Sequence, residues 1–220
     1  MGAFVLVPGA GGDAWYWHRV VPLLRAAGHD ALAVDLPGDD PAATLPEYAR
    51  LVRDAIGDRT GVVLVAQSLG GFTAPLVAAH GAVRAVVLVN AMVPVPGETP
   101  GEWWEATGWA DAQARAAADG GYPHGLDPEV VFLHDVPPEV LATGGEPRGE
   151  ADAVFGSVCD FTAWGAPVHV LAGADDRFFP LGFQRAVARD RLGLPVEVLP
   201  GGHLVALARP DELVGRLLQV

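Results

Sequence analysis

Residues 62–80 read VVLVAQSLGGFTAPLVAAH, and they carry the clearest structural signal in this chain. The apolar run at 62–66 is short and rich in valine, which predicts a buried strand. The residues from about 70 to 80 predict a helix. Between the two lies Ser68, next to small residues that allow a sharp turn. A strand, a serine turn and a helix in this order are the context of a nucleophile elbow, which presents the serine at the edge of a sheet.

The alternation of strands and helices continues on both sides of this segment. Short apolar runs predict strands at residues 4–7, 31–34, 62–66, 83–89, 167–172 and 195–199. Helical patterns lie between or after them at residues 15–27, 46–56, 70–80, 181–192 and 211–218. Unbroken apolar strands that alternate with amphipathic helices are typical of a parallel sheet covered on both faces. We therefore predict an α/β fold with a mostly parallel sheet of about six strands.

Residues 92–163 interrupt this rhythm. The segment is rich in glycine, proline, alanine and tryptophan, and no strand is predicted in it. Helical patterns occur in pieces, at residues 103–106, 110–118 and 137–142. An unstructured loop of this length inside a compact domain is uncommon. The sequence therefore predicts a helical cap at 92–163, inserted into a core domain that consists of residues 1–91 and 164–220.

Composition excludes several classes of function. The 220 residues include 27 acidic and 14 basic side chains, a formal net charge of −13, and every basic residue is arginine. The absence of lysine excludes Schiff-base and P-loop chemistry, and the acidic balance argues against nucleic acid or an anionic membrane as a partner. Cys159 is the only cysteine, so we expect no internal disulfide and no metal site. No apolar run reaches the roughly 20 residues of a membrane helix and no signal peptide is recognised, which predicts a soluble cytoplasmic protein.

Ser68 is a candidate nucleophile, although serine is also a common helix N-cap, and both interpretations stay open at this point. A serine hydroxyl needs a base, and the base needs an acid that orients it. Asp175, Asp176 and His203 each follow a predicted strand. The carboxyl ends of parallel strands meet at one edge of a sheet, where α/β folds assemble their sites. We therefore predict that Ser68, one of the two aspartates and His203 meet at this edge.

Further motifs accompany these residues. They lie at residues 5–12 (VLVPGAGG), 15–17 (WYW), 35–38 (DLPG), 66–70 (AQSLG), 176–180 (DRFFP) and 202–203 (GH). Together they resemble the α/β-hydrolase superfamily, and more narrowly its small capped group of plant-type methylesterases, hydroxynitrile lyases and bacterial esterase-like proteins. The resemblance covers essentially the whole chain. Two positions depart from the family pattern: Ala66 replaces the first glycine of the elbow, and Pro8 stands where many relatives have histidine.

The resemblance implies an enzyme of the serine hydrolase class that needs no cofactor. Its nucleophile would be Ser68 and its base His203. The family pattern places the acid four residues before a proline, which selects Asp176 over Asp175. The implied activity is that of a carboxylesterase, which cleaves small to medium apolar esters through an acyl-enzyme. The expected partner is a small-molecule substrate.

The resemblance also implies an oxyanion hole. Its two donors would be the backbone amides of Leu69, directly after the nucleophile, and of Ala10 in the first loop. The glycines of that loop let the backbone approach a ligand closely. We therefore expect Gly9 and Gly11 to lie against the substrate.

Three tryptophans of the predicted cap, Trp103, Trp104 and Trp109, have two possible roles. One role is to line an apolar substrate pocket, which we suggest for Trp103 and Trp104. The other role is to fix the cap to the core, and it is favoured for at least two of the three tryptophans. The related hydroxynitrile lyases use a lysine directly after the catalytic histidine and a threonine in the first loop. Here these positions are Leu204 and Gly9, which points to ester hydrolysis.

Two other classes of function remain open. Residues 9–14 fit the G-x-G-x-x-A dinucleotide fingerprint, and Asp35 follows about 20 residues later, as in an NAD(P)-binding Rossmann protein. Against this class, the aromatic residues 15–17 crowd the expected cofactor helix, and the ordered serine, aspartate and histidine stay unexplained. The third class is a hydrolase fold that binds a ligand without catalysis.

Overall fold

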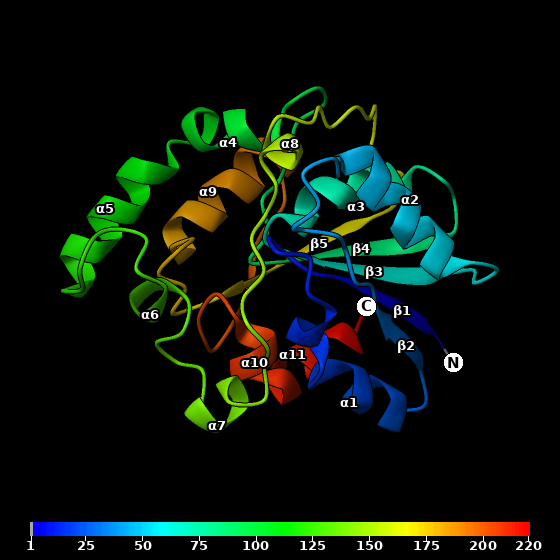
Figure 1. Ribbon diagram of the computed structural model, residues 1–220, viewed down its shortest axis with the longest axis horizontal. Coiled ribbons are helices and arrows are strands. Elements are labelled where there is room, and N and C mark those ends of the chain that lie inside the picture. Colours follow the sequence, from blue (N-terminus) through cyan, green and yellow to red (C-terminus); the bar gives the residue numbers. More distant parts are fainter. Residues whose placement is uncertain (1) are drawn as a thin grey trace.

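The computed structural model describes residues 2–220 and is built around one six-stranded sheet (Figure 1). The strand order is β2-β1-β3-β4-β5-β6, and every neighbouring pair is parallel. This confirms the predicted α/β class. The strands are β1 (Ala3–Val7), β2 (Asp30–Ala33), β3 (Val62–Gln67), β4 (Val83–Val89), β5 (Val168–Gly173) and β6 (Glu197–Leu199).

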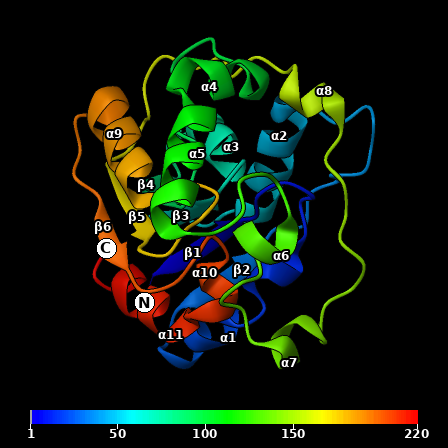
Figure 2. The same ribbon diagram turned by 90° about the vertical axis from the view of Figure 1, so that its left-hand side faces the viewer.

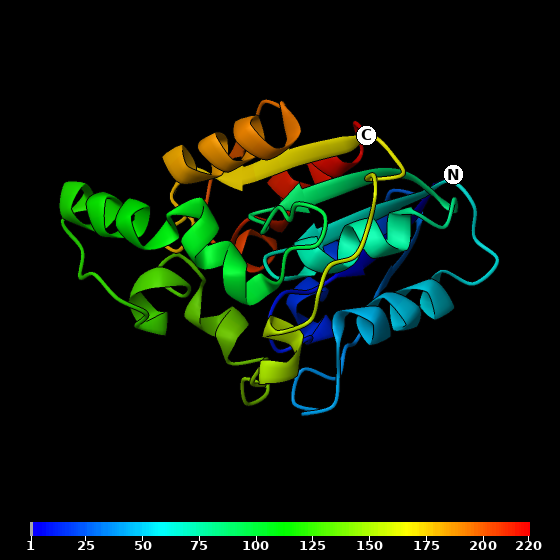
Figure 3. The same ribbon diagram turned by 90° about the horizontal axis from the view of Figure 1, so that it is seen from above.

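Helices cover both faces of the sheet because the strands are apolar on both. In β1, Val5 and Val7 pack into one hydrophobic cluster, whereas Phe4 and Leu6 pack into the other, as the two-residue period of a strand requires. Figure 3 looks down on the face covered by α2 (Leu45–Ile56), α3 (Gly70–Ala78) and α9 (Leu181–Leu192). The opposite face carries α1 (Val20–Ala26), α10 (Val205–Ala208) and α11 (Pro210–Leu217).

The predicted helix at 15–27 is wrong over its first turn. Residues Ala14–Trp17 form a short 3₁₀ turn, and the α-helix begins only at Val20. The Asp13 carboxylate accepts the Trp15 amide at 2.7 Å and starts this turn. Two bulky rings, Tyr16 and Trp17, are then buried against the sheet. Packing of these rings thus overrides the continuous helical pattern.

The segment 92–163 contains helices and no strand. Its helices are α4 (Pro100–Thr107), α5 (Trp109–Gly120), α6 (Pro128–Val131), α7 (Pro138–Leu141) and α8 (Asp152–Phe155). Figure 2 looks toward the carboxyl ends of the strands, and α4, α5 and α6 lie in front of the sheet in this view. The sequence patterns missed α6 and α8, which are one turn each. Its description as a separate cap domain stays a prediction.

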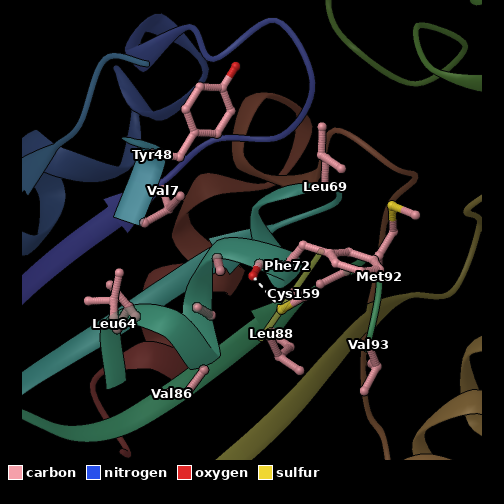
Figure 4. Packing of buried hydrophobic residues seen from close by; sticks show 14 of the residues in the cluster. Val7, Tyr48, Leu64, Leu69, Phe72, Val86, Leu88, Met92, Val93 and Cys159 are labelled. Carbon is pink, nitrogen blue, oxygen red and sulfur yellow. Dashed lines mark hydrogen bonds between the residues drawn. The ribbon is translucent and has the colours of Figure 1, made fainter. Parts of the chain in front are cut away.

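Cys159 connects the end of this segment to the core. Its thiol donates to the Phe72 carbonyl oxygen at 3.2 Å, inside the cluster that Figure 4 shows. Burial raises the pKa of the thiol to about 12, so it stays protonated at neutral pH. Cys159 therefore acts as a small buried side chain with one weak hydrogen bond.

A buried ion pair holds the beginning of the segment. Arg191 of α9 donates through Nη2 to Glu98 Oε1 at 2.9 Å, and through Nη1 to the Val93 carbonyl oxygen at 2.7 Å. The exposed fractions are only 11% for the arginine side chain and 7% for the glutamate. Removing one partner of a buried pair leaves the other charge without compensation, which is strongly destabilising.

We expect Arg191→Met to lower the free energy of unfolding by about 3 kcal/mol, because Glu98 stays buried and unpaired. Urea unfolding followed by circular dichroism measures this value. Arg189→Met on the same helix is the matched control, since the Arg189 side chain is 68% exposed beside Asp190. It is expected to change the free energy by less than about 0.5 kcal/mol. Equal effects of the two substitutions would contradict this account.

Candidate active site

Ser68 lies on a strained turn between β3 and α3. Its φ is +49°, which is uncommon for a residue with a side chain. The turn is possible because two glycines follow: a Cβ at Gly70 would lie 2.5 Å from the Pro8 carbonyl oxygen, and one at Gly71 would lie 1.9 Å from that of Met92. The backbone is thus folded tightly around the serine, as the sequence motif predicts.

The Ser68 side chain contacts His203 and does not cap α3. Its Oγ lies 3.1 Å from His203 Nε2. The N-cap of α3 is Leu69, and no side chain makes a capping hydrogen bond there. The interpretation of Ser68 as a helix cap is therefore wrong.

His203 lies between the serine and Asp176 and is 2% exposed. Its Nδ1 lies 2.8 Å from Asp176 Oδ2. Since a carboxylate oxygen accepts, Nδ1 carries the proton and Nε2 is free to accept the serine hydroxyl. The rings of Phe132, Phe178 and Phe179 surround the imidazole, with centroid separations of 5.3, 5.1 and 5.1 Å. These rings keep water away from the histidine.

The Asp176 carboxylate is held in place by further hydrogen bonds. Oδ1 accepts the amides of Phe178 and Phe179 at 2.9 and 2.8 Å. Oδ2 accepts Gln184 Nε2 at 3.2 Å in addition to His203. Four donors satisfy a carboxylate that is only 4% exposed. These bonds replace the water that the carboxylate loses on burial and fix its orientation.

Asp175 has a different environment from its neighbour. It is exposed, and its Oδ2 accepts the Gly201 amide at 3.2 Å. The distance between Asp176 and His203 thus decides which of the two aspartates faces the histidine.

The sequence patterns did not identify Asn90, whose side chain holds the backbone of Gly202 and His203. Asn90 follows β4 and is completely buried, with φ +45°. Its Nδ2 donates to the carbonyl oxygens of Gly202 and His203, both at 3.0 Å, and its Oδ1 accepts the Gly173 amide at 2.7 Å. A polar residue directly after an apolar run, at the carboxyl end of a strand, is the signal that could have found it.

Ala10 and Leu69, whose amides are the predicted oxyanion donors, both line the same cavity as Ser68. Neither amide donates to an acceptor within the described chain. Gly9 lets the first loop lie against the nucleophile, since a Cβ there would be 2.8 Å from the Ser68 Cβ. Both free N–H groups are thus available to an oxygen bound beside the serine.

The cavity has a volume of about 500 Å³ and is almost entirely apolar. Among residues 2–220, His203 is the only ionisable side chain in its wall. The remaining wall residues are Ala10, Gln67, Ser68, Leu69, Met92, Trp104, Pro128, Phe132, Leu133, Pro147, Phe155, Phe178 and Leu204. Such a cavity matches an uncharged apolar ligand.

Three of the four predicted substrate contacts are not in this wall. Trp103 is fully buried and donates through Nε1 to the Val93 carbonyl oxygen at 3.1 Å, so the prediction that it lines the pocket is wrong. Gly11 faces the Arg148 backbone and Gly9 faces the nucleophile. Trp104 does line the cavity, whereas Trp109 is fixed to the Phe178 carbonyl oxygen at 2.7 Å. Trp103 also packs against Phe179 and Phe183, with ring centroids 5.3 and 5.6 Å apart. Trp103 and Trp109 thus both fix the segment to the core.

The loop with the dinucleotide fingerprint is covered by the chain itself. A Cβ at Gly11 would lie 2.6 Å from the Arg148 carbonyl oxygen, and one at Gly12 would lie 2.4 Å from that of Leu36. Asp35, which would bind a ribose, instead accepts Arg148 Nη2 at 2.6 Å. A 3₁₀ turn follows the loop, so no α-helix N-terminus points at a phosphate position. These contacts contradict the dinucleotide interpretation.

Two features are absent from residues 2–220. No group of three or more histidine, cysteine, aspartate or glutamate side chains in this range could hold a metal ion. Within the same residues, no helix combines the length and the apolar character that crossing a bilayer requires.

Comparisons with known proteins show which proteins this chain resembles over its length. The profile of the Alpha/beta hydrolase family matches residues 4–216. Probable esterase PIR7A of Oryza sativa subsp. indica is 41% identical in an alignment 112 positions long, which covers 44% of this chain and 42% of that protein. The chain thus spans about two fifths of the length of this relative. Methylesterase 7 of Arabidopsis thaliana is 28% identical in an alignment 258 positions long, which covers 99% of this chain and 95% of that protein.

Solved structures share the fold. A pyrethroid hydrolase from Sphingobium faniae superposes with a TM-score of 0.77 at 22% identity, over 99% of this chain and 96% of that one. Methylesterase MES16 of Arabidopsis superposes with a TM-score of 0.77 at 20% identity, over 100% of this chain and 98% of that one.

Proposed function

This chain belongs to the Alpha/beta hydrolase family, and on that premise we propose that it is a serine carboxylesterase. The observation that carries the proposal is the continuous hydrogen-bonded path from Ser68 through His203 to Asp176, with distances of 3.1 and 2.8 Å, at the wall of an apolar cavity. The esterases and methylesterases among its relatives support the same class of reaction.

Acylation begins when Ser68 Oγ attacks the ester carbonyl carbon. His203 Nε2 takes the hydroxyl proton, and Asp176 stabilises the imidazolium that forms. The carbonyl oxygen becomes an oxyanion, which the amides of Ala10 and Leu69 stabilise by donating to it. When the tetrahedral intermediate collapses, His203 returns the proton to the leaving alcohol, and the acyl group stays on the serine.

Deacylation repeats these steps with water. His203 takes a proton from a water molecule, the resulting hydroxide attacks the acyl carbon, and the same amides hold the second oxyanion. The intermediate collapses to the free acid and the serine, whose Oγ regains the proton from His203. Ser68, His203 and Asp176, with the two amides, therefore account for every proton transfer and bond change of this cycle.

The wall of the cavity favours hydrolysis over cyanohydrin chemistry. The residue after His203 is Leu204, and its side chain contributes to the apolar wall. A lysine at this position would bring a charge to the leaving group, and leucine brings none. This supports plain ester cleavage.

A fluorophosphonate probe tests the proposal. It reacts with activated serines, and we expect one label per chain, on Ser68. Hydrolysis of p-nitrophenyl esters measured in parallel should show turnover. If the protein neither takes up the probe nor hydrolyses any of these esters, the proposal fails; ligand binding without turnover would then support a non-catalytic binding protein.

We expect a strong preference for uncharged esters. The kcat/KM for p-nitrophenyl butyrate should exceed that for the mono-p-nitrophenyl ester of succinate by a factor of about 100 or more, because the second substrate buries a carboxylate without a partner. The two acyl chains have four carbons each, so size is matched. Steady-state rates at pH 7.5 measure the ratio, and a ratio near one would contradict the apolar cavity as the acyl site.

A further inference from the structure

Residues 147–151, here called the strap, run along the first loop (residues 9–12) on the way from α7 to α8 (Figure 2). The Ala151 amide donates to the Gly38 carbonyl oxygen at 2.8 Å. Arg148 Nη1 donates to the Leu36 carbonyl oxygen at 3.2 Å. The strap is therefore attached to the core beside the loop that carries the Ala10 amide.

The Glu150 side chain of the strap reaches this loop directly. Its Oε2 accepts the Gly11 amide at 2.7 Å, and its Oε1 accepts the Tyr48 hydroxyl at 2.6 Å. Tyr48 is 2% exposed, so it anchors the carboxylate to α2 in the core. A hydrogen bond from a backbone amide to a carboxylate is stronger than one between neutral groups.

The loop needs such a restraint because of its composition. It contains Gly9, Gly11 and Gly12, and the last two have φ values of +84° and +67°. Glycine has more backbone freedom to lose than any other residue, so a loop with three glycines does not fix its own conformation. Within the loop, only one backbone hydrogen bond closes the turn, from the Gly12 amide to the Gly9 carbonyl oxygen at 3.1 Å.

We propose that Glu150 is a positioning residue for ester hydrolysis: it holds the Gly11 amide and thereby directs the neighbouring Ala10 amide toward the oxyanion. This rests on the proposed serine hydrolase function. The Gly11 N–H is bound to Glu150 and is not an oxyanion donor itself. The Ala10 N–H shares its peptide plane with the Gly9 carbonyl, which the Gly12 amide holds at 3.1 Å. Glu150 fixes the next plane through the Gly11 N–H, so on this proposal the two bonds together direct the Ala10 N–H toward the cavity that Ala10 lines. The inserted segment thus completes the oxyanion hole.

The positioning role of Glu150 requires a hydrogen-bond acceptor for the Gly11 amide and does not require a negative charge. Burial raises the pKa of the Glu150 carboxyl above its ordinary value, against the opposing effect of the bonds from Tyr48 and Gly11. A glutamine keeps both contacts, because its oxygen can accept the Gly11 amide and its NH₂ can donate to the Tyr48 oxygen. Alanine keeps neither.

Kinetics with p-nitrophenyl butyrate test the proposal. We expect Glu150→Ala to lower kcat by a factor of about 10 to 100 with KM changed less than about threefold, because an oxyanion donor acts mainly in the transition state. Glu150→Gln should keep kcat within about threefold of the wild type. Glu146→Ala is the matched control, an exposed carboxylate four residues earlier, and should behave as the wild type.

A trifluoromethyl ketone gives the second readout. It adds to Ser68 as a tetrahedral oxyanion, so its inhibition constant should rise in Glu150→Ala by about the factor that kcat loses. A loss of stability alone would leave kcat and the inhibition constant of the folded molecules unchanged. Circular dichroism measures the folded fraction. If Glu150→Ala does not fold, Glu150→Asp replaces it, since the shorter side chain withdraws the carboxylate and should also lower kcat.

Wild-type kcat in the folded Glu150→Ala or Glu150→Asp variant, or a Glu150→Gln variant as impaired as Glu150→Ala, would overturn the proposal. Absence of turnover and of fluorophosphonate labelling in the wild type is a different result. It would refute the serine hydrolase function itself, so the two failures are distinguishable.

Discussion

The Ser68→Ala variant is expected to lose ester hydrolysis, with kcat lower by a factor of about 10⁴ to 10⁶. The reason is that alanine leaves no oxygen that could attack the ester or carry the acyl group. The remaining groups, including the Ala10 and Leu69 amides, can stabilise only the slow attack of water. Steady-state assays with p-nitrophenyl butyrate measure the loss, and fluorophosphonate labelling should vanish with it.

The composition offers a matched control for this experiment. The chain contains two serines, Ser68 and Ser157. The Ser157 hydroxyl oxygen accepts the Leu45 amide at 3.2 Å at the start of α2, and its side chain is absent from the cavity wall. Ser157→Ala should therefore keep labelling and turnover. A probe that labels Ser68→Ala as well as the wild type would show that Ser68 is not the nucleophile.

The Asp176→Asn variant is expected to lower kcat by a factor of about 10³ to 10⁴. The amides of Phe178 and Phe179 donate to Oδ1, so the asparagine oxygen stays there and its NH₂ points at His203. The imidazole must then accept at Nδ1 and carry its proton on Nε2. In this tautomer Nε2 cannot take the proton of Ser68.

Asp175→Asn tests the choice between the two aspartates. Asp175 is exposed, and an asparagine at this position can still accept the Gly201 amide. We expect kcat to change less than about threefold, with the same p-nitrophenyl butyrate assay for both variants. A large loss in Asp175→Asn with little change in Asp176→Asn would reverse the assignment that the 2.8 Å contact supports.

The elements of the fold could be predicted because their signals are local. The strand at 62–66 and the turn at Ser68 follow from apolar side chains, small residues and glycine spacing within about a dozen positions. The structure agrees, with β4 (Val83–Val89) and α9 (Leu181–Leu192) at the predicted bounds. The helix prediction fails at residues 15–19 for the opposite reason, since Trp17 turns toward a sheet that the local pattern does not describe.

The contacts of the site required the tertiary structure. The sequence could place His203 and both aspartates at the same edge of the sheet. It could not give the hydrogen bond between His203 and Ser68, because these residues are 135 positions apart in the chain. It could not tell Asp175 from Asp176 by chemistry, because their residue types are identical and only the direction of the side chain differs. Likewise it could not separate Trp103, which is buried in the core, from Trp104 in the cavity wall.

The sequence by itself determined the parallel sheet, the serine turn and the set of residues from which a site could form. These properties depend on burial and on backbone sterics, which act between neighbours in the chain. Only the tertiary structure decided which members of that set meet, and it added Asn90 and Glu150, whose partners lie up to 139 positions away. Such contacts depend on how the packed layers bring distant side chains within hydrogen-bond distance, and no local pattern records that distance.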